Sequence, residues 1–155
     1  LALVKLWKLD ISDVELLRLG AKLGADVPVF LHGENTLAEG IGDIFQPLNV
    51  PQQVFCVLIP QIHVSTEQVF SDSSLTRDTP IKTIRGSLPP GLKNDLEAVT
   101  CRRYPPVEKA LNWLAQFGEA RMSGTGASGF LACASIQTAE KILHQRPEGV
   151  DGFVA

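Results

Sequence analysis

A glycine loop between two apolar runs constrains the fold of this chain more than any other feature. In residues 121–134 (RMSGTGASGFLACA), Gly124, Thr125 and Gly126 separate two segments with the composition of β-strands. The pattern predicts strand, loop and strand, and the N–H groups of such a loop are able to approach an anion closely. Two glycines around a threonine also suit a plain hairpin turn, so the loop alone does not decide between these interpretations.

Helical and strand-like segments alternate along the rest of the chain. Helices are expected at residues 1–9, between Ser12 and Gly24, after Ser65, and at residues 96–104, 107–117 and 138–145. Strands are expected as a bent pair over residues 35–48 and at residues 53–59 and 152–155. Residues 72–92 are polar and predict a long excursion with one short helix near residues 81–85. The order predicts an α+β fold, with helices packed on one face of a mostly antiparallel sheet.

Composition excludes several classes of function. The chain has 155 residues, a net charge of −3 and 20% charged residues, so nothing indicates a nucleic-acid partner. The longest apolar run, residues 54–60, is far shorter than the roughly 20 residues that cross a bilayer. Three separated cysteines without a C-x-x-C pair are typical of reduced cytosolic thiols. The three histidines share no metal-ligand spacing, so no metal site is expected.

A single acidic residue near the start, Asp26, is the candidate for chemistry. In residues 23–30 (LGADVPVF) it lies between Gly24, where a helix is expected to end, and Pro28, which is expected to lock a turn. The glycine permits the end of the helix and the proline restricts the backbone, so the carboxylate would be a positioned group. An aspartate before a proline turn is also a common Asx-type turn residue, and the motif alone leaves both interpretations open.

Four motifs in order carry a resemblance to a known family. They are GADVPVF at residues 24–30, AEGIGDIFQPL at 38–48, NDLE at 94–97 and SGTGASGF at 123–130. Together they resemble the GHMP family of small-molecule kinases, in particular the members that phosphorylate a hydroxyl of a cytidine-diphosphate-linked methylerythritol. The resemblance implies that residues 26–155 are the C-terminal, substrate-side domain and that residues 1–25 are the helical tail of the N-terminal domain.

The resemblance also implies roles for single residues. Asp26 would be the base or the group that orients the attacking hydroxyl, and Phe70 would stack on the cytosine ring. The other substrate-binding candidates are Ile41, Thr66, Gly124, Thr125 and Gly126. Phe70 alternatively is a core aromatic, and Asn94 with Glu97 is interpreted as a helix cap rather than a ligand pair.

The same resemblance implies ATP and Mg²⁺ for the intact kinase, but this chain contains no G-x-x-x-x-G-K-[ST] loop. The phosphate-binding loop is expected upstream of Leu1, in an N-terminal half that would be the partner of this chain. We therefore expect a piece cut at both ends from a longer cytoplasmic or plastid enzyme, inactive by itself. The alternatives are a non-catalytic α+β module that binds a phosphorylated metabolite and a purely structural interaction domain.

Overall fold

The computed structural model describes residues 1–40, 44–80 and 93–155, which form two compact units. One unit is built from the described residues up to Pro51, and the other from the described residues after it. This division lies at residues 51–52. The boundary between family domains that the resemblance predicts after residue 25 is a different one, and it stays a prediction.

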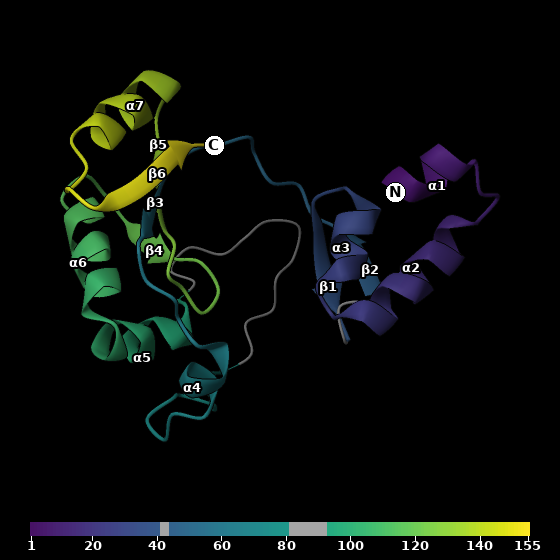
Figure 1. Ribbon diagram of the computed structural model, residues 1–155, viewed down its shortest axis with the longest axis horizontal. Helices are drawn as coiled ribbons and strands as arrows, with labels where there is room; N and C mark the ends of the chain where they lie inside the picture. The colour runs from purple at the N-terminus through teal and green to yellow at the C-terminus, as the bar shows by residue number, and fades with distance from the viewer. Residues whose placement is uncertain (41–43, 81–92) are drawn as a thin grey trace. The chain divides into compact units, whose positions relative to one another are not determined.

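The first unit contains three helices and a two-stranded sheet among its described residues (Figure 1). Its elements are α1 (Ala2–Trp7), α2 (Asp13–Leu23), α3 (Val27–His32), β1 (Thr36–Glu39) and β2 (Ile44–Pro47). The two strands pair antiparallel, which confirms the predicted strand pair. Gly20 is buried where α2 packs on α3, and a Cβ there would lie 2.5 Å from Leu31 Cδ1. The close approach of the two helices therefore depends on glycine.

The predicted limits of α2 are confirmed, and Asp26 lies in the predicted turn after it, but the placement of Pro28 in that turn is wrong. The Ser12 side chain accepts a hydrogen bond from Glu15 N at 3.2 Å, and Gly24 is the C-cap. Pro28 does not lock a turn but lies in the first turn of α3, with Asp26 at the N-cap. The reason is physical: the first turn of a helix needs no N–H from proline, and its fixed φ suits a helix start.

The second unit is an antiparallel four-stranded sheet with the strand order β4-β5-β3-β6. Its strands are β3 (Val54–Pro60), β4 (Ala120–Met122), β5 (Gly129–Cys133) and β6 (Val150–Val154). Its helices are α4 (Thr66–Phe70), α5 (Asp95–Arg103), α6 (Pro105–Leu114) and α7 (Ile136–His144). The predicted α+β class is confirmed. The short helix predicted near residues 81–85 lies outside the described residues.

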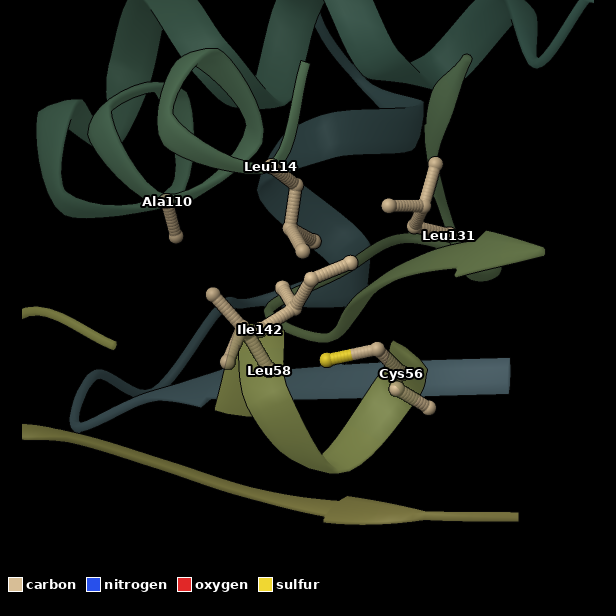
Figure 2. Close-up of a cluster of buried hydrophobic side chains, with 7 residues drawn as sticks. Cys56, Leu58, Ala110, Leu114, Leu131 and Ile142 are labelled. Carbon is tan, nitrogen blue, oxygen red and sulfur yellow. The ribbon is translucent and has the colours of Figure 1, made fainter. Parts of the chain in front are cut away.

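The main core of this unit lies between the sheet and the helices α6 and α7 (Figure 2). Cys56 and Leu58 alternate along β3 and point to the same face, because successive strand residues point to opposite faces. They pack against side chains from α6, β5 and α7, namely Ala110, Leu114, Leu131, Ala139 and Ile142. Both helices therefore cover one face of the sheet, as the α+β prediction requires.

A second buried cluster lies among α4, α5, α6 and β4. Its members are Val64, Val69, Leu75, Val99, Val107, Leu111 and Met122. Val69 and Val99 are 0% and 2% exposed, so α4 and α5 share a packed interface. Packing in this cluster fixes the position of the segment after β3, including α4, beside the glycine loop that follows Met122.

Candidate functional site

The glycine loop is the turn of a tight hairpin between β4 and β5. Ser123 N donates to Ser128 O at 2.9 Å, and Gly126 N donates to Ser123 O at the same distance. Gly124 and Gly126 have φ values of +55° and +96°. Both values lie in the region that favours glycine, so the two glycines are required by the backbone itself. The structure thus confirms the prediction that the loop turns a hairpin.

Helix α5 holds this loop through three side chains spaced three residues apart. Asn94, its N-cap, donates from Nδ2 to Met122 O at 3.1 Å and to Gly124 O at 2.7 Å. Glu97 Oε2 accepts from Met122 N at 2.8 Å, and Thr100 Oγ1 donates to Thr125 O at 3.0 Å. Residues three apart lie on one side of a helix. One stripe of α5 therefore fixes the main chain of the loop at successive points.

Asn94 and Glu97 correct the interpretation of the NDLE motif as a helix cap alone. Asn94 does cap the helix, because its Oδ1 accepts from Leu96 N at 3.1 Å. The Glu97 carboxylate, however, accepts a hydrogen bond from Met122 N, and the Asn94 side-chain amide donates to the carbonyl groups of Met122 and Gly124. These bonds span 25 to 30 residues of sequence, which explains why a local motif could not predict them.

Helix α4 also reaches the loop. The hydroxyl groups of Thr66 and Thr125 lie 3.2 Å apart, within hydrogen-bond distance. Two residues predicted as substrate-binding, 59 positions apart in the sequence, are thus brought together. Ser65 caps α4, while the Tyr104 hydroxyl accepts from Ser65 N and donates to Gln68 Oε1, both at 3.2 Å. The capping box predicted here is therefore bridged by a tyrosine from the end of α5.

Phe70 is the last residue of α4 and is 49% exposed. This exposure excludes the alternative that Phe70 is a core aromatic, since Val69 beside it fills the core position. Phe70 O accepts a hydrogen bond from the Arg77 guanidinium. The ring is thus a free apolar surface on a helix whose first residue reaches the glycine loop.

The turn directly after α4 is fixed by a carboxylate. Asp72 accepts from the Ser74 hydroxyl at 2.6 Å, from Arg103 Nη1 at 2.8 Å and from Arg102 Nη2 at 3.1 Å. Hydrogen bonds from Ser74, and next from Arg103, hold the pKa of the Asp72 carboxyl well below its usual range. The two arginines belong to the C-terminal turn of α5, so this helix also holds the segment that follows Phe70.

Asp26 and Ile41 are not brought to this site by any described contact. Asp26 is exposed, and its side chain does not cap α3. It belongs to the first unit, so its predicted convergence with the glycine loop stays a prediction. Ile41 lies outside the described residues.

Two cavities border the site within the second unit. One of about 460 Å³ lies over the sheet and is lined mainly by Phe55, Val57, Phe130 and Phe153, with Ser123 and Ser128 from the base of the loop. The other, of about 560 Å³, lies among α5, α6 and β4 and has Glu97 and Arg121 in its wall. Burial raises the pKa of Cys56 and of Cys101, so both stay protonated at neutral pH.

Side chains that commonly bind metal ions do not cluster among the described residues. These residues contain no group of three histidine, cysteine, aspartate or glutamate side chains placed to share a metal ion. In the described part of the chain, none of the helices is both long and apolar enough to cross a membrane.

Comparison with known proteins identifies the class. Residues 84–151 match the family model described as GHMP kinases C terminal. This match covers the glycine loop and the α5 stripe that holds it, so the resemblance to GHMP kinases is confirmed for this part of the chain.

Two curated relatives carry the name of one kinase. The chain is 48% identical over 158 residues to a Hahella chejuensis protein named 4-diphosphocytidyl-2-C-methyl-D-erythritol kinase, covering 100% of this chain and 53% of that relative. A Thiobacillus denitrificans protein of the same name is 44% identical over 155 residues, covering 100% of this chain and 56% of the relative. The chain thus spans about half the length of the curated relatives it matches.

A solved structure shares the fold. The crystal structure of a 4-(cytidine 5'-diphospho)-2C-methyl-D-erythritol kinase matches with a TM-score of 0.79 at 25% identity, over 99% of this chain and 59% of the other. The similarity therefore extends over both compact units.

Proposed function

We propose that this chain is the substrate-side part of an ATP-dependent kinase. The enzyme would phosphorylate the 2-hydroxyl of 4-diphosphocytidyl-2-C-methyl-D-erythritol, in the non-mevalonate route to isoprenoid precursors. The observation that carries the proposal is identity of 48% along the whole chain to a kinase of that name. The geometry supports it, because Thr66 and Thr125 lie side by side and the free ring of Phe70 follows on the same helix.

In the proposed reaction, the substrate hydroxyl oxygen bonds to the γ-phosphorus of ATP as the bond from that phosphorus to the β-phosphate oxygen breaks and ADP leaves. Asp26 accepts the hydroxyl proton on a carboxylate oxygen. Phe70 stacks on the cytosine ring. Thr66, Ile41 and the loop of Gly124, Thr125 and Gly126 shape the substrate pocket.

The ATP phosphates would be held by the N-terminal half, which we propose as the partner of this chain. Mg²⁺ neutralises charge on the transferred phosphoryl group when bound. Among the described residues, no three histidine, cysteine, aspartate or glutamate side chains are grouped to hold a metal ion. Because the ATP phosphates would be held by the N-terminal half, the 155-residue chain by itself is expected to be inactive. The intact enzyme is expected in the cytoplasm, or in a plastid if it comes from a plant.

The test uses the full-length protein and its Asp26→Asn variant, with substrate turnover and KM as readouts. Loss of a general base typically lowers kcat by about 10²–10⁴, whereas KM should change little because the charge matters as the hydroxyl attacks. Asp10→Asn is the matched control, because Asp10 is an exposed loop residue of the same unit. A parent protein without kinase activity would refute the function. Turnover of Asp26→Asn within about threefold of the parent would return Asp26 to a turn residue.

A further inference from the structure

Asn94 uses its whole side-chain amide, and only one of its three hydrogen bonds serves the helix. Oδ1 accepts from Leu96 N at 3.1 Å, which is the capping bond. Nδ2 donates to Met122 O at 3.1 Å and to Gly124 O at 2.7 Å. The partners fix the orientation of the amide, because an N–H must face its oxygen and two carbonyls must face its nitrogen.

Capping alone does not explain asparagine at this position. Aspartate and serine cap helices about as well as asparagine does. Neither can donate two hydrogen bonds to two different carbonyl oxygens, and a carboxylate would repel them. Asparagine at position 94 is therefore explained by the hydrogen bonds that it donates to the loop rather than by helix capping.

The loop carbonyl that Asn94 holds belongs to Gly124, the residue with φ of +55°. The carbonyl of the next residue, Thr125, accepts from Thr100 Oγ1, and the Thr125 hydroxyl lies within hydrogen-bond distance of the Thr66 hydroxyl. Within the described part of the chain, the amide N–H groups of Gly124 and Thr125 form no hydrogen bond. The Gly124 carbonyl and the Thr125 N–H belong to the same peptide, so Asn94 fixes the direction in which the Thr125 N–H can face a ligand.

We propose that Asn94 is a positioning residue for the substrate. Its amide holds the peptide of Gly124 and Thr125 in the orientation that presents the loop N–H groups and the Thr125 hydroxyl to the diphosphate-bearing alcohol substrate. The inference rests on the proposed function, and it assigns the NDLE motif a role beyond helix capping.

The experiment compares Asn94→Asp and Asn94→Ser in the full-length protein. Both variants keep a capping oxygen, and Asn94→Asp adds a charge that faces the two carbonyl groups. Each lost neutral hydrogen bond corresponds to roughly a factor of 2 to 10, so we expect kcat/KM for the alcohol substrate to fall about 5- to 100-fold, most in Asn94→Asp. KM for ATP should stay unchanged. Asn112→Asp, an exposed substitution of the same type on α6, should leave all parameters near those of the parent.

The outcomes separate this inference from the proposed function. An inactive parent would refute the function itself. With an active parent, Asn94 variants within about threefold of it would refute the positioning role. An equal loss toward both substrates, together with a lowered melting temperature, would show that Asn94 serves stability only. If Asn94→Asp does not fold, Asn94→Ser decides by the same comparison, since it is neutral.

Discussion

Two glycines of the same loop should respond very differently to alanine. Gly124 and Gly126 both have positive φ, at +55° and +96°. A Cβ on Gly124 would meet nothing within 4 Å, whereas a Cβ on Gly126 would lie 3.1 Å from Met122 Sδ and 3.1 Å from Thr100 Cγ2. Comparing the two alanine variants therefore separates the cost of backbone strain from the cost of side-chain crowding.

The expected magnitudes follow from these surroundings. A left-handed backbone costs an alanine about 1–2 kcal/mol, and the lost freedom of the unfolded chain offsets about 0.4–1 kcal/mol. Gly124→Ala should thus lower the free energy of unfolding by about 1 kcal/mol. At Gly126 the crowding adds about 1–3 kcal/mol, because Met122 and Thr100 are 3% and 0% exposed and have little room to move. Gly126→Ala should therefore cost about 2–4 kcal/mol.

The measurement is equilibrium unfolding of both variants by denaturant, supported by thermal melting. Each kcal/mol should lower the melting temperature by about 2–4 °C in a chain of this size. The slope of the free energy against denaturant should not change, because the fold is retained. Equal losses for the two variants, or a larger loss for Gly124→Ala, would show that the contacts around Gly126 do not control the loop.

Four further predictions test other parts of the second unit. Leu58→Ala should cost about 2–5 kcal/mol in denaturant unfolding, because Leu58 is 0% exposed on the central strand. Asp72→Asn should lower the free energy of unfolding at neutral pH, and the difference from the parent should shrink as pH falls below about 4. Hydrogen bonds from Ser74 lower the pKa of the native Asp72 carboxyl, so its stabilisation is present above the unfolded pKa and is lost when the native carboxyl is protonated. Cys56, at 0% exposure and with a raised pKa, should react with a thiol reagent only at the rate of unfolding, as mass spectrometry of the labelled protein would show. Phe70→Ala should raise KM for the cytidine-containing substrate with little change in melting temperature, because the ring is 49% exposed.

Local chemistry made most of the fold predictable from the sequence. The caps at Ser12 and Ser65 each accept the hydrogen bond that their position predicts, and Gly24 ends its helix. The helix predicted at residues 138–145 begins two residues earlier in the structure, at Ile136, because Ser135 caps it by accepting from Thr138 N at 3.1 Å. A serine within a small-residue run after a strand gives little local signal, since the same residue also suits a turn.

The site was predictable only in part, since its geometry depends on contacts across the chain. Sequence reasoning selected Thr66 and Thr125 by resemblance, and only the packing of α4 beside the loop brings their hydroxyls to 3.2 Å. The roles of Glu97 and Thr100 were missed because their loop partners lie 25 residues away. Thr100 is 0% exposed in the structure, and the sequence alone does not show that its hydroxyl is buried and needs a partner.

Helix α5 links both predicted substrate-binding segments to one rigid element. Its first half holds the glycine loop through Asn94, and its last turn holds the segment after Phe70 through Arg102 and Arg103. Between these ends, Val99 is 2% exposed and anchors the helix in the second core cluster. A site needs its side chains held to within about half an ångström, which separate loops do not achieve by themselves. Because one helix sets the position of both segments, a shift of α5 would move them together and preserve their spacing, whereas loss of one end would change that spacing.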